Sequence, residues 1–156
     1  MSLSKKDGGL PPDSVVQTEE QILEDSRRVI QRYHDPDPLA MRKVVLAPCS
    51  PFSVSKELMV DTARLARSCG VRLHTHLAET TDEDEYCLRT HGKRPLELME
   101  DWEFTGPDVS YAHGIHFTDE ELEAVLAELD QRPQPRRAAG AGAILRRPTV
   151  DARPLA

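Results

Sequence analysis

The feature that most constrains the fold is an alternation of short apolar segments with longer amphipathic ones. The short segments have the length and β-branched content of buried strands, and they lie at 43–48, 71–77 and 108–113. The longer segments carry apolar residues at helical spacing, and they lie at 19–34, 55–69, 81–91, 95–101 and 118–130. An order in which helices separate successive strands is typical of a parallel sheet with right-handed crossovers.

Capping residues support the helix boundaries. Thr18–Gln21 and Thr118–Glu121 have the form of capping boxes, in which a threonine oxygen accepts a backbone N–H three residues later. Ser55 is expected to cap the second helix, and Gly70 is expected to end it. Thr81 is expected to cap an acidic turn whose carboxylates suit a helix N-terminus.

The length limits how much of a barrel the chain can form. A complete (β/α)8 barrel needs about 250 residues, whereas this chain has 156. We therefore expect an α/β fold that is a partial TIM barrel, with about three consecutive parallel strands and their helices. Residues 131–156 are different in kind, because 18 of these 26 residues are Arg, Pro, Ala or Gly without an apolar period. We expect 1–130 to form the folded segment and 131–156 a disordered tail.

Charge argues against a nucleic-acid partner. Residues 1–130 hold 26 acidic and 14 basic residues, while the tail holds six arginines and one aspartate. A strongly acidic body lacks the basic surface that phosphate binding requires. The tail arginines could contact phosphate in principle, but the segment has no pattern of regular structure.

Membrane and disulfide signals are missing as well. No run approaches 18 apolar residues, and the first nine residues lack the apolar core of a signal peptide. Cys49, Cys69 and Cys87 are odd in number and form no Cys-x-x-Cys pair. The sequence therefore predicts a cytoplasmic protein with reduced thiols and no membrane association.

The strongest candidate site lies in the segment Leu73–Glu79, with the sequence Leu-His-Thr-His-Leu-Ala-Glu. His74 and His76 lie two apart on a strand and point to the same side. Glu79 follows just past the strand end, where parallel α/β sheets collect catalytic groups. His76 is thus placed as a metal ligand and Glu79 as a nearby general acid/base. The alternative is that both histidines are polar residues packed at a strand end.

His113 stands at the end of the next predicted strand, after Tyr111 and Ala112. The carboxyl ends of neighbouring parallel strands meet at one edge of a sheet, so His113 is expected beside His76. It could ligate a metal ion, or it could hydrogen-bond a metal-bound water or a substrate. Two consecutive strands that both end in histidine favour a functional role over a structural one.

The loop Pro48–Ser53 follows the first predicted strand and reaches the same edge. Two interpretations stay open: a proline-stiffened connection, or a lip that brings Cys49 or Ser50 to a substrate. Nucleophilic hydrolase chemistry is disfavoured, because the sequence has no Gly-x-Ser-x-Gly elbow and Cys49 has no activating base beside it.

These segments resemble the cytosine-deaminase-like branch of the amidohydrolase superfamily, in its chlorohydrolase and deaminase group. The likeness covers about residues 1–130. The matching segments are Asp7–Gln17, Leu46–Ser53, Leu73–Thr80 and Ala112–Ile115.

The resemblance implies a (β/α)8 barrel with one catalytic divalent metal, usually zinc, with iron as another choice. It implies that His76 is the metal ligand on the fifth strand, Glu79 the proton shuttle and His113 the histidine beside the metal-bound water. His74, like Cys49 and Ser50, is expected to have a lesser role near the substrate. The implied reaction is attack of a metal hydroxide on an aromatic amidine carbon with loss of ammonia.

The implied substrate is a small heterocycle, an aminated purine of the 8-oxoguanine kind. The alternative is a chlorohydrolase or aminohydrolase acting on s-triazines, which uses the same metal chemistry and a different leaving group. The resemblance also allows homo-oligomers of full-length family members.

The departures from the family pattern are also informative. The His-x-His pair of the first barrel strand, the aspartate of the eighth and the seventh-strand region have no counterpart here. We therefore expect a truncated or frame-shifted gene product, with weak or no metal binding and no turnover by the isolated chain. A non-catalytic fragment is the rival hypothesis.

Overall fold

Three parallel strands form an open sheet in the order β1-β2-β3. They are β1 (Val45–Leu46), β2 (Arg72–Leu77) and β3 (Val109–His113). In the register of the sheet, Leu46 pairs with Leu73, and Leu73 pairs with Val109. The computed structural model describes residues 1–9 and 11–130, and the predicted disorder of 131–156 lies outside these residues.

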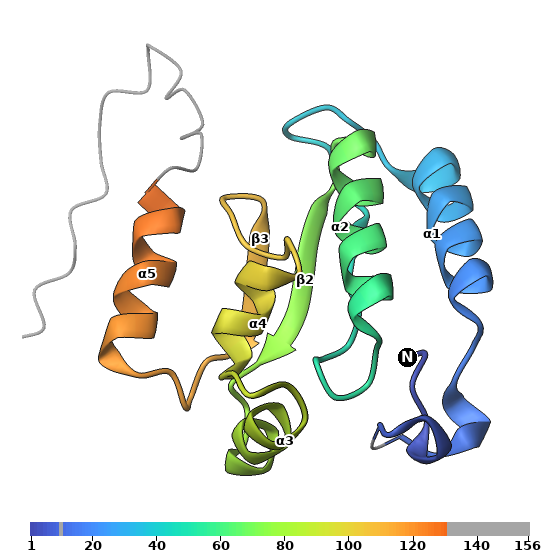
Figure 1. Cartoon of the computed structure of the whole chain (residues 1–156). Helices are drawn as coiled ribbons and strands as arrows, with labels where there is room; N and C mark the ends of the chain where they lie inside the picture. The colour runs from blue at the N-terminus through green and yellow to red at the C-terminus, as the bar shows by residue number, and fades with distance from the viewer. Residues whose placement is uncertain (10, 131–156) are drawn as a thin grey trace, which may run out of the picture.

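Within the described residues, five α-helices and two short 3-10 helices accompany the sheet (Figure 1). They are η1 (Lys5–Asp7), η2 (Asp13–Val15), α1 (Glu19–Tyr33), α2 (Lys56–Cys69), α3 (Thr81–His91), α4 (Pro95–Asp101) and α5 (Asp119–Asp130). This order confirms the predicted α/β fold with three consecutive parallel strands and their helices. None of the helices in the described part of the chain has the length and apolar character needed to span a bilayer.

Most of the predicted helix caps are present, and one is displaced. The side chains of Thr18, Ser55 and Thr118 each accept a backbone N–H three residues later. The prediction that Thr81 caps α3 is wrong, because Thr80 holds the extended N-cap conformation and accepts the Glu83 N–H at 3.3 Å. Thr81 is instead the first residue of the helix.

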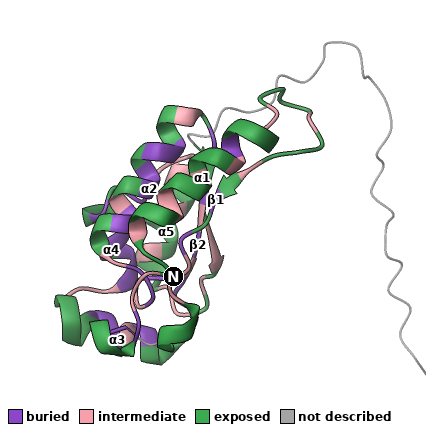
Figure 2. Ribbon diagram, turned by 90° about the vertical axis from the view of Figure 1, so that its right-hand side faces the viewer, coloured by how far each residue is buried: buried purple, intermediate pink, exposed green. Residues whose placement is uncertain are grey.

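Side chains of β2 alternate between two very different surroundings. Leu73, Thr75 and Leu77 are buried, whereas His74 and His76 are only half-buried. The apolar ones join one core cluster with residues of α2 and of the segment 96–104. Figure 2 shows α2 and α4 on one side of the strands and none of the described helices packed against the other. One face of the sheet is therefore covered by helices and the other is open.

Unusual backbone geometry gathers where β2 and β3 end. Ala78 has φ of 53° and His113 has φ of 71°, and they are two of the three described non-glycine residues with positive φ. Such conformations are sparsely populated and cost of order 1–3 kcal/mol each. The Gly114 N–H donates to the Leu77 carbonyl, and the His116 N–H donates to the Ala78 carbonyl, both at 3.0 Å. The loops after the two strands thus hold each other in place.

Candidate active site

Three histidine rings lie together on the open face, near the carboxyl ends of β2 and β3. The ring centroids of His74 and His76 are 5.8 Å apart, and those of His76 and His113 are 5.4 Å apart. The predicted juxtaposition of β2 and β3 histidines is therefore present. It follows from the parallel register, in which His76 pairs with Ala112 and Leu77 pairs with His113.

His76 is held in an orientation that suits a metal ligand. Its Nδ1 lies 2.9 Å from the Cys49 carbonyl oxygen, which also accepts the His76 main-chain N–H at 3.0 Å. Because a carbonyl oxygen only accepts hydrogen bonds, Nδ1 carries the proton and the neutral ring keeps the lone pair on Nε2. Fixing the tautomer through the other ring nitrogen is how metal-binding histidines are usually oriented.

Glu79 and His113 form the second part of the cluster. The Glu79 Oε1 lies 3.6 Å from His113 Nε2, too long for a direct hydrogen bond but within ion-pair range. Their side chains are 42% and 33% exposed, so a ligand or water can reach both. A carboxylate beside an imidazole at an accessible strand end can accept and return a proton.

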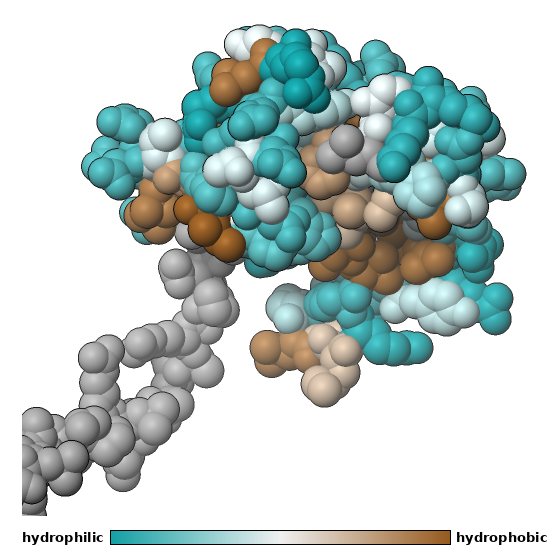
Figure 3. Space-filling model, turned by 90° about the horizontal axis from the view of Figure 1, so that it is seen from below, coloured by the Kyte–Doolittle hydropathy of each residue, from teal (hydrophilic) through white to brown (hydrophobic). Residues whose placement is uncertain are grey.

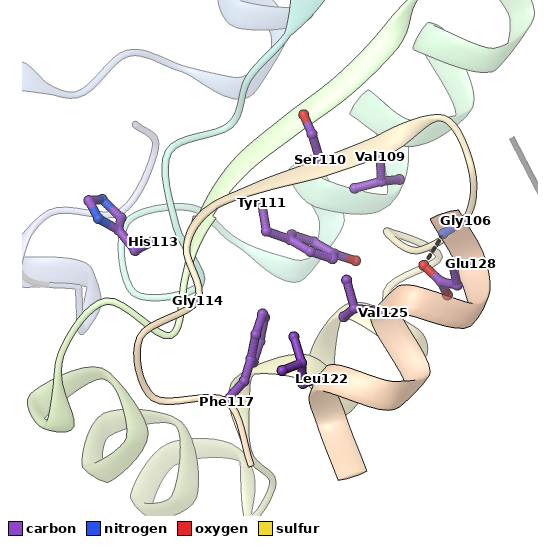
Figure 4. A pocket seen from close by; sticks show the side chains of 10 residues that line it. All are labelled: Gly106, Val109, Ser110, Tyr111, His113, Gly114, Phe117, Leu122, Val125 and Glu128. Carbon is purple, nitrogen blue, oxygen red and sulfur yellow. Dashed lines mark hydrogen bonds between the residues drawn. The ribbon is translucent and has the colours of Figure 1, made fainter. Parts of the chain in front are cut away.

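The positive φ of His113 determines where its ring lies. In regular alternation His113 would share a face with Tyr111, which is directed toward the helices. Figure 4 instead shows the His113 ring turned away from Tyr111, Phe117, Leu122 and Val125. The strained backbone thus places the ring on the open face, beside His76 and Glu79.

His74 lies on the same face, one step back from the strand end. Its Nδ1 is 2.9 Å from the Ser110 hydroxyl, which also donates to the Leu73 carbonyl at 3.2 Å. The ring touches His76 edge to face. This arrangement buttresses the His76 ring, and a direct contact of His74 with substrate stays a prediction.

The loop after β1 brings its two candidate residues to different places. Ser50 is 1% exposed and its hydroxyl lies 2.7 Å from that of Ser53, so it is directed into the protein. Cys49 lines a surface pocket together with Phe52 and Ser53 of the same loop and with four residues of the N-terminal segment: Met1, Pro11, Pro12 and Val15. Figure 3, seen from the side toward which the strands point, shows hydrophobic side chains in a hollow bordered by hydrophilic ones. A substrate role for Cys49 or Ser50 stays a prediction.

The donor set fits one ligand position of a zinc site. His76 Nε2 is an imidazole donor whose tautomer is fixed by the Cys49 carbonyl. Catalytic zinc takes three protein ligands and an open position. Within residues 1–9 and 11–130, no group of three or more His, Cys, Asp and Glu side chains is arranged to hold a metal ion. His76 would therefore hold zinc only together with ligands from outside this cluster.

One carboxylate near the site is not predicted by the sequence pattern. Glu83 lies in the acidic run that predicts a charged helix start, yet it is 1% exposed and accepts the backbone N–H groups of Ala78 and Glu79. Burial is the main cause that raises its pKa, against the lowering effect of these hydrogen bonds. Its position, third in the helix and four residues after Glu79, is the signal that could have revealed it.

Cys87 offers no activated nucleophile. Burial in the core raises the pKa of the Cys87 thiol to about 12, and Glu83 and Asp84 add to the shift. A thiol of that kind is almost entirely protonated near neutral pH. The three cysteines of the described residues are free, with Cys49 and Cys69 partly exposed.

Comparison with known proteins links the chain to one family. Residues 7–144 match the model of the amidohydrolase family. The chain is 51% identical over 122 residues to an 8-oxoguanine deaminase from Pseudomonas aeruginosa, covering 78% of this chain and 27% of that protein. It is 40% identical over 127 residues to a hydroxydechloroatrazine ethylaminohydrolase from Pseudomonas sp. (strain ADP), covering 81% and 26%.

A solved structure gives the same relationship in three dimensions. An atrazine chlorohydrolase from Arthrobacter aurescens TC1, complexed with zinc, superposes with a TM-score of 0.78 and 27% sequence identity. The match covers 82% of this chain and 28% of that one. The chain thus spans about a quarter of the length of the relatives it matches.

Proposed function

The chain belongs to the amidohydrolase family, and we propose that it carries the proton-transfer part of a metal-dependent hydrolytic deaminase site. The observation that carries the proposal is the cluster of His76, Glu79 and His113 at two adjacent strand ends. In it a histidine of fixed tautomer lies beside a second imidazole, which in turn faces an accessible carboxylate.

Each residue has a distinct role in the proposed reaction. His76 Nε2 would hold the metal. Zinc, when bound, lowers the pKa of water to roughly 7 and so supplies a nucleophile at neutral pH. Glu79 takes a proton from the attacking water as the C–O bond forms at the amidine carbon. It then delivers this proton to the exocyclic nitrogen as the C–N bond breaks and ammonia leaves.

His113 is proposed to orient the attacking water and to stabilise charge on the adding oxygen. Its Nε2 faces Glu79, so one ring nitrogen can share the proton that the carboxylate transfers. His74 is proposed to support the His76 ring through its own bond to Ser110.

We propose an aminated purine of the 8-oxoguanine kind as the substrate, supported by the 51% identity to the Pseudomonas aeruginosa deaminase. An s-triazine is the second candidate, because the chain also resembles an ethylaminohydrolase and a zinc-containing atrazine chlorohydrolase. The free cysteines support action in a reducing, cytoplasmic setting.

The metal role is tested on the chain itself by thermal unfolding with and without zinc. A ligand that binds the folded state raises the midpoint. We expect a small rise for the wild type, none for His76→Ala, and a wild-type rise for the control His116→Gln. An equal rise in wild type and His76→Ala would exclude His76 as the ligand.

The reaction is tested in a chimera, because the chain spans about a quarter of its relatives. The matching 122-residue segment of the Pseudomonas aeruginosa deaminase is replaced by that of this chain. We expect ammonia release from 8-oxoguanine and its loss in Glu79→Gln and His113→Ala, with Glu85→Gln as a control. Release of ethylamine from the s-triazine instead would favour the second candidate, and an inactive chimera that folds and binds zinc would contradict the proposal.

A further inference from the structure

A buried carboxylate, Glu83, lies directly behind the backbone that carries Glu79. Its Oε1 accepts the Ala78 N–H at 3.1 Å, and its Oε2 accepts the Glu79 N–H at 2.9 Å. The side chain is 1% exposed, although glutamate is almost never fully buried without partners. One carboxylate therefore binds two successive amides at the end of β2.

This contact differs from an ordinary helix cap. A glutamate at the third position of a helix usually returns to the N–H of the capping residue, which here is Thr80. Glu83 reaches past Thr80 to the two residues before it. Ala78 has φ of 53°, a conformation that an alanine adopts only when its surroundings enforce it. The carboxylate supplies that enforcement on the N–H side.

The carbonyl side of Ala78 is fixed from another direction. Its oxygen accepts the His116 N–H, and the neighbouring Leu77 carbonyl accepts the Gly114 N–H. Both donors belong to the loop that follows His113 in sequence. Glu83 therefore completes a set of bonds that places the Glu79 backbone relative to the His113 backbone.

The geometry demands a carboxylate rather than any polar side chain. Each carboxylate oxygen accepts one N–H, so both amides are satisfied by charge-assisted hydrogen bonds that offset part of the cost of burial. A glutamine has one acceptor oxygen, and its NH2 group would oppose the second N–H. The substitution Glu83→Gln thus removes one bond while keeping the shape of the side chain.

We propose that Glu83 is a positioning residue that holds Glu79 against His113 for proton transfer. This inference rests on the proposed role of Glu79 in catalysis. Misplacement of a reacting group by about 1 Å can lower the rate roughly 100-fold. A fixed backbone at Glu79 would therefore raise the rate of proton transfer.

The first test uses NMR on the whole chain without metal, so it is independent of turnover. In the wild type we expect scalar couplings across the hydrogen bonds from the Ala78 and Glu79 amides to the Glu83 carboxyl carbon. We also expect a nuclear Overhauser effect between the Glu79 side chain and the His113 ring. The absence of both couplings would overturn the proposal, whatever the variants do.

The variants separate positioning from general stability. In Glu83→Gln we expect one amide to lose its protection from exchange and the Glu79–His113 effect to weaken, while other amides keep their shifts. Glu83→Asp should lose both bonds, because its side chain is one methylene shorter. The matched control Glu85→Gln removes an exposed charge from the same helix and should change none of these signals. A nuclear Overhauser effect between Glu79 and His113 that is unchanged in Glu83→Gln would overturn the proposal.

The values of kcat and KM in the chimera distinguish positioning from a purely structural role of Glu83. We expect Glu83→Gln to lower kcat by about 10- to 100-fold with KM changed less than about twofold. In a Glu79→Gln background the further loss should vanish, because the two residues act as a unit. A rise in KM alone, or additive losses, would contradict positioning. An inactive chimera with intact amide couplings would refute the proposed function and leave the geometry of Glu83 established.

Discussion

The two faces of the sheet differ in burial and in the kind of contact that their side chains make, even within the single strand β2. On the covered face, Leu73 and Leu77 have no exposed surface and pack against helices. On the open face, His74 and His76 are half-buried and bond to Ser110 and to the Cys49 carbonyl. Neighbouring residues in the sequence thus serve opposite purposes, because side chains alternate across a strand.

The covered face stabilises the fold, and the open face carries the candidate functional side chains. Apolar burial supplies the main favourable free energy of folding, and on this sheet it comes from the covered face. The open face carries groups that are costly to bury and useful to expose. If substitutions on the two faces change the free energy of unfolding by similar amounts, this division between the faces is wrong.

The largest expected effect belongs to Leu73→Ala. Leu73 is completely buried in the central strand, so truncation removes apolar contacts and leaves a cavity. We expect a loss of about 2–5 kcal/mol in the free energy of unfolding, measured with urea. The adjacent His74→Ala, on the open face, should cost less than about 1 kcal/mol. Equal losses would show that the open face is packed as tightly as the covered one.

The next effect concerns a polar clasp at the carboxyl ends of the strands, centred on Arg94. Its guanidinium donates to Glu121 and Asp84 at 2.9–3.0 Å and to the His116 carbonyl at 2.9 Å. This joins α3, the start of α4, α5 and the loop after β3. Removing the Arg94 guanidinium leaves the two partly buried carboxylates without their cationic partner.

We expect Arg94→Met to lower the free energy of unfolding by about 1.5–3 kcal/mol. Arg94→Lys should recover only part of it, because an ammonium cannot reproduce the planar fork. The control Arg28→Met breaks an exposed pair with Asp25 and should change stability by less than about 0.5 kcal/mol. A loss for Arg94→Met as small as the control's would mean that the clasp contributes nothing to the fold.

Local patterns in the sequence were enough to predict the elements. Capping at Thr18, Ser55 and Thr118 and the alternation of strands and helices have short-range causes, so they could be read directly. The cap of α3 was misplaced by one residue, because Thr80 and Thr81 are chemically equal and only the backbone conformation separates them.

The site could be predicted only in part, for a physical reason. His76 and His113 were placed together because parallel strands share a carboxyl edge, and the structure brings them together. The bond of His76 to the Cys49 carbonyl joins residues 27 positions apart, and no sequence pattern reports it. Glu83 could not be singled out because the other three residues of 82–85 are also acids, exposed or half-buried, and its burial arises only from tertiary packing.

A smaller effect concerns the pH dependence of stability and Glu83. Burial raises its folded-state pKa, with Asp84 and Glu79 acting in the same direction. The unfolded chain therefore releases this proton at a lower pH than the folded chain does. As the pH rises from about 4.3 through the folded pKa, the folded state loses stability relative to the unfolded state.

Glu83→Gln cannot titrate, so this particular loss disappears in the variant. Urea unfolding of both proteins between about pH 4 and about pH 7 measures it. We expect the wild type to become less stable relative to Glu83→Gln as the pH rises. The opposite trend would mean that the two backbone hydrogen bonds outweigh burial and lower the pKa instead.

The smallest expected effect on stability is that of His76→Leu, without metal. The Cys49 carbonyl keeps the His76 main-chain N–H and the Thr75 hydroxyl as donors, so no buried acceptor is left without a partner. The ring loses one hydrogen bond, worth about 0.5–1.5 kcal/mol, and the leucine adds apolar contact on a half-buried surface. We expect a net change below about 1 kcal/mol together with complete loss of the zinc-dependent rise in melting midpoint. If His76→Leu instead destabilised the chain as much as Leu73→Ala, the open face would be part of the core, and the separation between packing and chemistry would fail.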